Sequence, residues 1–391
     1  MRPFSRISLA AVTAATMAVA TFPQVMFGVL AADLIQDFDV ERWQVGALVT
    51  ATAGTGAVLS PTFGRLTDRL GAVRSTIGVL FVGIACLTLV ALSPSYLILF
   101  LVALLTGVPQ GWANPATNTL IVDNVLPGAR GVITGIKQSG VPMGTFIGGI
   151  LLPTVATIWD WRAAIATFLV VPVATLIAMR GRPEGEHHPA SGSGIGLRVP
   201  LVVRYIAVYG ALAGLATSAT FTFLPLFAEE SQGWSGFQAG FLIAGVGLVG
   251  VAARIIWGSS SERWFGHGKT LMVIAVLTAI SALLLALAAS GAVSSWILVP
   301  AAGLFGIGII AWNAVGMLAV MDYSPVGLVG RGTGLVQLGF LFGLSVGAPL
   351  MGFSVDRLDV YGPGWLAVAV LSLGCVVVAG RIRKAITLNA S

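Results

Sequence analysis

The sequence predicts an all-α integral membrane protein with twelve transmembrane helices in two pseudo-symmetric six-helix bundles. Three observations support this prediction: the composition, the number of long apolar segments, and an internal repeat. Of the 391 residues, 57% are hydrophobic and only 9% are charged, whereas a typical soluble domain has about 25% charged residues. So few charges cannot cover the surface of a soluble protein of this length. The composition therefore excludes a soluble enzyme, a nucleic-acid-binding domain and a disordered chain.

Twelve segments of the chain are apolar over the roughly 20 residues that one membrane span requires. They cover residues 8–32, 43–63, 75–94, 97–121, 132–156, 162–180, 201–228, 236–257, 270–290, 296–320, 332–353 and 363–380. Because every backbone N–H and C=O group needs an internal partner in hydrocarbon, we expect each segment to be a helix. The N-terminus resembles a signal peptide, but its apolar run continues to Leu30, so we expect this run to remain as the first span.

The positions of the basic residues predict how the chain crosses the membrane. If the N-terminus is cytoplasmic, 16 of the 21 Lys and Arg residues fall in inner segments and three, Arg42, Arg162 and Arg357, fall in outer ones. This asymmetry predicts a multi-pass protein of the cytoplasmic (inner) membrane with both termini in the cytoplasm. The net charge of +6 is then explained by anionic lipid of the bilayer, and we expect no nucleic-acid partner.

An internal repeat divides the chain into two similar halves. A polar linker at 181–200 separates a predicted bundle at 1–180 from a second bundle at 201–391. At an offset of 199 residues, the first half recurs in the second as the pairs Asn114/Asn313, Asp123/Asp322, Thr134/Thr333, Gln138/Gln337, Gly140/Gly339, Gly144/Gly343 and Gly148/Gly347. Earlier in each half the offset is 194, which aligns Gly64 with Gly258. Two parallel six-helix repeats around a midplane site are typical of secondary transporters.

The loop after the second predicted span carries a recognisable motif. Residues 64–74 read G-R-L-T-D-R-L-G-A-V-R, which closely resembles the loop 2–3 signature of the major facilitator superfamily, G-x-L-x-D-R-x-G-x-R/K. The second half has a degraded copy at 258–266, with one additional residue before its second glycine. Together with the spans and the repeat, the resemblance covers essentially the whole chain. It implies a secondary transporter that works by alternating access and is usually monomeric.

The same motif supplies the candidate gating residues. Its glycines allow a tight turn and a close approach of helices, and Asp68 can face a helix N-terminus or an Arg of the other half. The resemblance implies that this pairing holds the outward-facing state. A generic basic inner loop would explain the arginines, but not an acid between glycines in both halves. The candidate gating residues are Gly64, Asp68, Arg69, Gly71, Arg74, Gly258, Glu262 and Arg263.

Two basic residues inside spans are the main candidates for binding a substrate. Lys137 and Arg254 lie within the fifth and eighth predicted spans, where a basic side chain costs about 2.5–3.5 kcal/mol on insertion scales. They are either anchors that reach the cytoplasmic surface or partners of Asp123 and Asp322, or they form an anion site. Arg254 resembles the span-8 arginine that binds carboxylate in the oxalate and monocarboxylate branches of the family. Ser60 occupies the matching position of the first half, so the repeat does not require this charge.

The leading hypothesis is therefore transport of a small organic anion, such as a carboxylate, with a coupled proton or a counter-anion. The candidate substrate-binding residues are Lys137, Arg254, Gln24, Asn114, Gln138, Tyr209, Trp312, Asn313 and Gln337. The alternative is a proton-coupled efflux antiporter for drugs or metabolites. The glycines at 140, 144 and 148 resemble the span-5 signature of such antiporters, although they also suit close helix packing. The sequence contains no nucleophile–base pair and no set of metal ligands, so we expect neither an enzyme, a cofactor nor a metal site.

Overall fold

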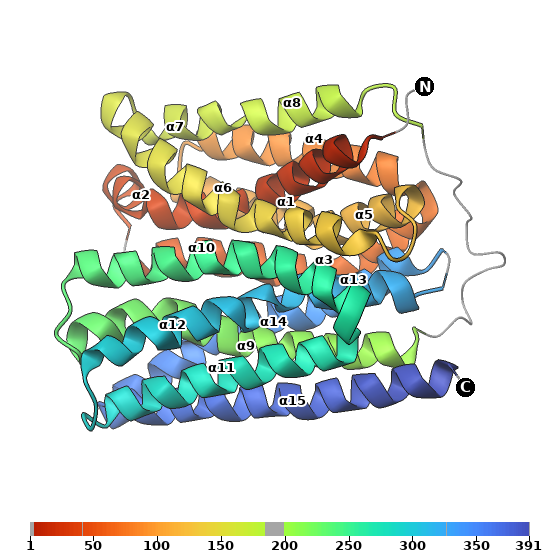
Figure 1. Cartoon of the computed structure of the whole chain (residues 1–391). Coiled ribbons are helices and arrows are strands. Elements are labelled where there is room, and N and C mark those ends of the chain that lie inside the picture. Colours follow the sequence, from red (N-terminus) through yellow and green to blue (C-terminus); the bar gives the residue numbers. More distant parts are fainter. Residues whose placement is uncertain (1–3, 41, 184–198, 326, 391) are drawn as a thin grey trace. The chain divides into compact units, whose positions relative to one another are not determined.

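The computed structural model describes residues 4–40, 42–183, 199–325 and 327–390, and its regular elements there are all helices (Figure 1). They are α1 (Arg6–Val29), α2 (Ala31–Phe38), α3 (Arg42–Leu70), α4 (Ala72–Ala91), α5 (Tyr96–Asn124), α6 (Arg130–Ile158), α7 (Trp161–Phe168), α8 (Val170–Met179), α9 (Leu201–Glu230), α10 (Gly236–Ser260), the π-helix η1 (Ser261–Phe265), α11 (His267–Ala289), the 3-10 helix η2 (Ser295–Ile297), α12 (Leu298–Ile307), the 3-10 helix η3 (Ile309–Ala311), α13 (Trp312–Tyr323), α14 (Val329–Leu358) and α15 (Gly362–Ala390). The all-α fold that the sequence predicts is thereby confirmed.

The described part of the chain contains 11 helical segments that are long and apolar enough to cross a membrane. They overlap eleven of the twelve predicted spans. The remaining predicted span, 43–63, lies within α3, a helix of 29 residues that carries several Gly and Thr residues among its apolar ones. Its length suffices for a span, whereas its composition is less apolar than that of the other eleven.

The described helices belong to two compact units. Unit 1 comprises Met1–Pro127, Ile136–Val199 and Ser324–Leu338, and unit 2 comprises Gly128–Gly135, Pro200–Tyr323 and Gly339–Ser391. The first turns of α6 and α14 therefore belong to a different unit from the rest of each helix. Most of the predicted linker, residues 184–198, lies outside the described residues.

Glycines of α6 bring the helices of unit 1 together at backbone distance. A Cβ atom at Gly140 would lie 2.0 Å from the carbonyl oxygen of Ala14 on α1, and one at Gly144 would lie 3.2 Å from the Cβ atom of Ala18. Any larger side chain on this face would push α6 away from α1. The spacing of these glycines therefore allows α6 to pack closely on α1, which is the packing interpretation that the sequence also offers.

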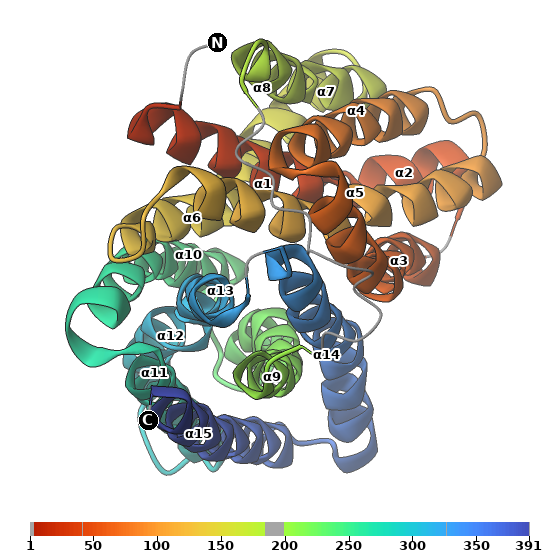
Figure 2. The ribbon, with the colours of Figure 1, turned by 90° about the vertical axis from the view of Figure 1, so that its right-hand side faces the viewer.

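Unit 2 repeats this packing between α14 and α9. Cβ atoms at Gly339 and Gly343 would lie 2.4 and 2.1 Å from the carbonyl oxygens of Ala207 and Ala211. Figure 2 shows α9 beside α13 and α15, both of which contact it. The glycines that the internal repeat aligns thus carry out the same packing task in both units.

The tenth predicted span, 296–320, is a broken helix. It consists of η2, α12, η3 and α13, and the break lies at Gly308, whose φ of −82° and ψ of −116° leave the helical region. The equivalent span of the first repeat, α5, is continuous although it contains Pro109 and Pro115. Breaks inside membrane helices free backbone carbonyl groups, which must then find other donors.

Candidate functional site

A cluster of buried polar side chains lies in unit 1, on α5, α6 and the start of α14. Its members are joined by hydrogen bonds, and we call it the Lys137 cluster: Asn114, Asn118, Lys137, Gln138, Thr333 and Gln337. Lys137 Nζ donates to Asn114 Oδ1 at 2.9 Å and also to Asn118 Oδ1. The structure thus brings together four of the predicted substrate-binding residues, which are Asn114, Lys137, Gln138 and Gln337.

Asn114 is the centre of this cluster. Its Oδ1 atom accepts a second hydrogen bond from Gln138 Nε2 at 3.1 Å, and its Nδ2 atom donates to Gln337 Oε1 at 3.0 Å. One turn later on α5, Asn118 Nδ2 donates to Thr333 Oγ1 at 3.0 Å. The two glutamines that the repeat aligns therefore hold the same asparagine from α6 and from α14.

The charge of Lys137 has no counter-charge within the described part of unit 1. The side chain is fully buried, with 0% exposure, and both of its acceptors are neutral amide oxygens. No described acidic side chain lies within 4.0 Å of its ammonium group. Burying an ion without an opposite charge costs several kcal/mol, so the described part of unit 1 leaves the charged form of Lys137 uncompensated.

Arg254 is a second buried cation, in unit 2. It is 8% exposed, and its Nε atom donates to the carbonyl oxygen of Ile310 at 3.1 Å. Its Nη1 atom is buried and has no hydrogen-bond partner. As for Lys137, no described acidic side chain forms an ion pair with it. A guanidinium group with an unused donor is suited to a carboxylate, which its planar fork can bind through two oxygens.

The remaining predicted substrate-binding residues have different environments. Tyr209 is fully buried and its hydroxyl group donates to the carbonyl oxygen of Leu271 at 3.0 Å, so this donor is already used. The ring of Trp312 packs on Tyr209, yet its Nε1 atom has no partner. Asn313 Oδ1 is likewise buried without a partner, whereas Gln24 is half-buried on α1. Trp312 therefore has an unpaired donor and Asn313 an unpaired acceptor, whereas the hydroxyl donor of Tyr209 is already used.

The last turns of α3, which carry the motif residues Gly64 and Asp68, bind the start of α14 within unit 1. Asp68 Oδ1 and Oδ2 accept hydrogen bonds from the N–H groups of Gly330 and Arg331 at 2.7 and 2.8 Å. The backbones touch beside these bonds, since a Cβ atom at Gly64 would lie 2.3 Å from the carbonyl oxygen of Gly330. We call this arrangement the Asp68 contact. The first N–H groups of a helix have no partner within that helix, and the start of a helix attracts negative charge. The carboxylate of Asp68 therefore supplies both the acceptors and the charge that the start of α14 favours.

Burial also sets the ionisation of this carboxyl group. Removal from solvent raises the pKa of Asp68 to about 7 and outweighs the opposing effect of the hydrogen bonds from Arg331 and Gly330. The carboxyl group of Asp68 therefore holds a proton more tightly than the carboxyl group of a solvated aspartate does.

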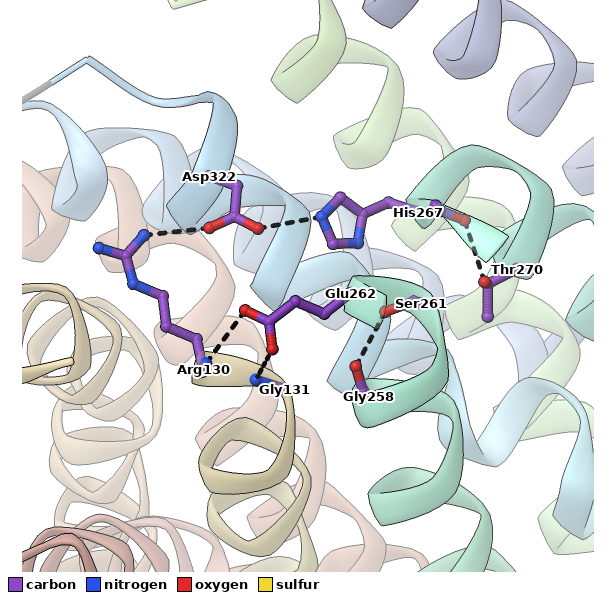
Figure 3. A network of polar contacts seen from close by, with 9 residues as sticks. Arg130, Gly131, Gly258, Ser261, Glu262, His267, Thr270 and Asp322 are labelled. Atoms are coloured by element: carbon purple, nitrogen blue, oxygen red, sulfur yellow. Dashed lines mark hydrogen bonds and ion pairs between the residues drawn. The ribbon is translucent and has the colours of Figure 1, made fainter. Parts of the chain in front are cut away.

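Unit 2 contains the equivalent arrangement at the start of α6, which Figure 3 shows from close by. Glu262 Oε1 and Oε2 accept hydrogen bonds from the N–H groups of Arg130 and Gly131 at 3.0 and 2.8 Å. A Cβ atom at Gly131 would lie 2.3 Å from the carbonyl oxygen of Gly258. We call this the Glu262 contact. Both halves of the chain thus place an acid of the loop motif on the start of a helix from the other half.

An ion-pair network adjoins the Glu262 contact (Figure 3). Asp322 Oδ1 accepts from Arg130 Nη1 at 3.0 Å, and Asp322 Oδ2 lies 3.0 Å from His267 Nε2. The sequence allows Lys137 and Arg254 to be partners of Asp123 and Asp322. For Asp322 this interpretation is wrong. Its partners come from the starts of α6 and α11, where basic residues can reach it without entering the interior of a span.

The other predicted gating residues lie at the edges of the two contacts. Gly71 and Gly266 both have positive φ angles, +89° and +74°, which glycine adopts without strain. They are equivalent despite the additional residue of the second half, because the π-helix η1 accommodates it. The arginines are exposed: Arg69, Arg74 and Arg263.

Several residues of these sites do not appear among the predicted ones. Asn118 follows Asn114 by one helical turn, so its place on the same face was a usable signal. The repeat aligns Thr333 with Thr134, but its uncharged side chain does not mark it as a site residue. Arg130 and His267 come together with Asp322 only through the fold, and no spacing in the sequence indicates this.

Comparisons with known proteins agree with this architecture. The family model described as Major Facilitator Superfamily matches residues 12–325 and 206–385. The chain is 28% identical over 384 residues to the enterobactin exporter EntS of Escherichia coli O1:K1, covering 92% of this chain and 89% of that protein. EntS sequences from other Escherichia coli strains, such as O157:H7, show the same 28% identity.

Solved transporters share the fold at low sequence identity. The proton:xylose symporter XylE, with bound 6-bromo-6-deoxy-D-glucose, superimposes with a TM-score of 0.77 at 13% identity, covering 95% of this chain and 94% of that chain. A bacterial homologue of the iron transporter ferroportin, in an outward-facing state, has a TM-score of 0.75 at 13% identity over 96% and 99% of the two chains. With the family model, the repeat and the twin loop motifs, these results establish that the chain belongs to the major facilitator superfamily of membrane transporters.

Proposed function

We propose that this transporter exports a small organic metabolite carrying an anionic group, by alternating access across the inner membrane. One observation carries the proposal: each unit buries a basic side chain, Lys137 in one and Arg254 in the other, and neither has an acidic partner among the described residues. From the distribution of Lys and Arg we also propose that both termini are cytoplasmic.

The energetic argument is one of charge compensation. A buried ion without a counter-ion is strongly unfavourable, and the attraction between opposite charges is larger in a low-dielectric interior than in water. An anionic substrate supplies the missing charge, and a neutral or cationic substrate does not. The amide groups around Lys137 and the unused donor of Arg254 add hydrogen-bonding capacity of the kind that a carboxylate needs.

The direction of transport is inferred from the relatives. Proteins that share 28% identity with 92% of this chain are enterobactin exporters, which supports export of a metabolite rather than uptake of a nutrient. The Asp68 and Glu262 contacts would then be the gating contacts, formed in one state of the cycle and broken in another. A proton or a counter-anion would supply the driving force.

The alternative is efflux of lipophilic cationic drugs. The glycines of α6 at 140, 144 and 148 resemble the span-5 motif of drug antiporters. Gly140 and Gly144, however, pack directly against α1. Efflux of cationic drugs also gives no role to the buried positive charges of Lys137 and Arg254. Each hypothesis predicts a different set of ligands, which makes the two separable by one binding experiment.

The experiment is thermal unfolding of the full-length protein in detergent with benzoate, succinate or tetraphenylphosphonium. A ligand at 100 times its Kd adds about 2.7 kcal/mol to stability. We expect a carboxylate to raise the unfolding temperature of the wild type, and Lys137→Met and Arg254→Met to reduce this effect. Lys269→Met, which removes an exposed charge, serves as the matched control and should behave as the wild type. Stabilisation by tetraphenylphosphonium alone, unchanged in both variants, would contradict the proposal.

A further inference from the structure

The turn between α10 and α11 is one residue longer than its copy in the first repeat. The first half reads D-R-L-G at 68–71, and the second half reads E-R-W-F-G at 262–266. Two aromatic residues, Trp264 and Phe265, therefore replace the single apolar residue Leu70. The π-helix η1 accommodates the additional residue within the turn.

The additional residue is needed neither for the contact of the acid nor for the turn itself. Asp68 in unit 1 and Glu262 in unit 2 each accept hydrogen bonds from two backbone N–H groups, at distances between 2.7 and 3.0 Å. Gly71 and Gly266 both follow with positive φ angles. The shorter turn of unit 1 therefore meets both requirements, so the aromatic pair of unit 2 has a different role.

Both aromatic side chains lie on the surface of unit 2. Trp264 is 75% exposed and Phe265 is 53% exposed, whereas Leu70 in unit 1 is 36% exposed. The turn joins two helical segments that are apolar enough to cross a membrane, so the rings lie at the end of two spans. Aromatic rings at this depth are typical of the interface between bilayer and water, where they contact lipid.

Three exposed basic residues belong to the same surface. Arg263 directly precedes the two rings, and Lys269 lies on the first turn of α11. Arg383 of α15 joins them, because a Cβ atom at Gly268 would lie 2.9 Å from Arg383 Cβ. None of the three has an acidic partner within 4.0 Å among the described residues.

The acids beside this turn already have partners (Figure 3). Glu262 accepts hydrogen bonds from the backbone N–H groups of Arg130 and Gly131. Asp322 pairs with Arg130 and His267. The surface thus combines two exposed rings with three positive charges that the described residues leave uncompensated. A partner that suits this surface has an anionic part and an apolar part.

We propose that five residues of unit 2 form a binding site for an anionic phospholipid of the bilayer: Arg263, Trp264, Phe265, Lys269 and Arg383. The basic side chains pair with the headgroup, and the rings pack beside the glycerol and the upper acyl chains. A zwitterionic lipid lacks the net charge that three cations attract, and a free anion leaves the rings uncovered. Each basic residue near a membrane surface favours anionic lipid about 5-fold, so three favour it about 100-fold.

The bound lipid also restrains the Glu262 contact. Glu262 lies two residues before Trp264 on the same π-helix η1, so anchoring the ring in the bilayer limits the movement of the carboxylate away from Arg130 and Gly131. The turn of unit 1 has no aromatic residue at the equivalent position. We therefore expect anionic lipid to strengthen the Glu262 contact and to leave the Asp68 contact unchanged.

The first test identifies the lipid that contacts Trp264. The full-length protein is placed in phosphatidylcholine nanodiscs that contain an increasing fraction of brominated phosphatidylglycerol or brominated phosphatidylcholine, whose bromine atoms quench tryptophan fluorescence on contact. Subtracting the signal of Trp264→Phe isolates the fluorescence of Trp264. We expect brominated phosphatidylglycerol to half-quench this fluorescence at an about 100-fold lower mole fraction than brominated phosphatidylcholine. Equal quenching by the two lipids, or no quenching by either, would refute the proposal.

Charge variants and a second tryptophan are the controls for this test. Arg263→Gln, Lys269→Gln and Arg383→Gln in one chain remove the cations and keep both rings, so Trp264 should then respond equally to the two lipids. Trp296 is 69% exposed, and residues 271–300 around it include no Lys or Arg. Its fluorescence, isolated with Trp296→Phe, should show no preference. A preference at Trp264 that survives in the triple variant would contradict the role of the cations.

The second test follows the Glu262 contact in the same nanodiscs without bromine. In a protein whose native cysteines are replaced by alanine, Ile133→Cys lies at a buried position and reacts with uncharged N-ethylmaleimide when the start of α6 separates. We expect phosphatidylglycerol to slow this reaction about 5-fold, the effect of one basic contact with anionic lipid. Trp264→Leu, which introduces the residue of the first repeat, should remove the effect, and Thr333→Cys beside the Asp68 contact should show none. Equal rates for Ile133→Cys in the two lipids would overturn the restraint.

Discussion

Replacing Gly330 with alanine perturbs the Asp68 contact at the start of α14. A Cβ atom at this position would lie 2.4 Å from the carbonyl oxygen of Gly64 and 2.6 Å from Asp68 Oδ1, whereas ordinary contact begins at 3.4 Å. The start of α14 must therefore move by about 1 Å. This movement takes the N–H groups of Gly330 and Arg331, now 2.7 and 2.8 Å from the carboxylate, beyond hydrogen-bond range.

The free-energy cost follows from the two lost bonds. Each hydrogen bond to a charged group contributes about 1.5–3 kcal/mol, so losing both costs about 3 kcal/mol at the lower end of this range. At pH 8, where Asp68 is ionised, this corresponds to a roughly 100-fold larger population in which α14 has separated from α3.

Thiol labelling measures this population. Thr333 is fully buried one turn after Gly330, so a cysteine introduced there reacts with a maleimide only when α14 separates. The native thiols of Cys86 and Cys375 are buried and are replaced by alanine in the parent protein. We expect Gly330→Ala to increase the labelling rate of Thr333→Cys by about 100-fold.

A matched control separates this effect from a general loosening of the fold. Gly149 also lies within a long helix, but a Cβ atom there would meet nothing within 4 Å. Gly149→Ala should leave the labelling rate unchanged. An unchanged rate in Gly330→Ala as well would refute the account of the Asp68 contact.

Three further predictions follow from the same contacts. In unit 2, a Cβ atom at Gly131 would lie 3.0 Å from Glu262 Oε2, so Gly131→Ala should increase the labelling rate of a cysteine at the buried position 133, and an unchanged rate would contradict the equivalence of the two contacts. Burial raises the pKa of Asp68 from 3.8 to about 7, so the Asp68 contact is strongest below about pH 4 and weakens as the pH rises to 7. Labelling of Thr333→Cys, corrected for thiolate reactivity, should accelerate over that range, and Asp68→Asn should remove the dependence. Gly308→Ala should lower the unfolding free energy by about 1–3 kcal/mol because its Cβ atom meets Thr278, whereas Gly303→Ala, with open space around it, should not.

The spans were the most predictable part of the fold. Long apolar segments separated by basic loops have few alternatives in a membrane, and eleven of the twelve predicted segments match apolar helices of the structure. The break at Gly308 could not be predicted, because 50 glycines occur in the chain and most of them pack inside regular helices. In the structure Gly308 is distinguished by its backbone angles and by its close contact with Thr278 on α11.

The candidate sites were predictable where the repeat or a buried charge marked them. The repeat aligns Gln138 with Gln337, and both bind Asn114. The charge of Lys137 inside a span marks that residue as a candidate. The arrangement of Asp322 with Arg130 and His267 was not predictable, because these residues come from three elements far apart in the sequence.

The proposed function depends on a buried positive charge that the substrate neutralises, and Asn114→Asp tests this most directly. The substitution preserves the size of the side chain and places a carboxylate oxygen about 2.9 Å from Lys137 Nζ, so the protein itself supplies the missing charge. The second carboxylate oxygen replaces the Nδ2 donor to Gln337, so the Gln337 amide must turn to present its NH2 group to the new carboxylate. The measurement is thermal unfolding with and without benzoate or succinate. We expect Asn114→Asp without ligand to unfold at a higher temperature than the wild type and to lose most of the stabilisation by the carboxylate. Undiminished stabilisation by the carboxylate in this variant would contradict the proposed function.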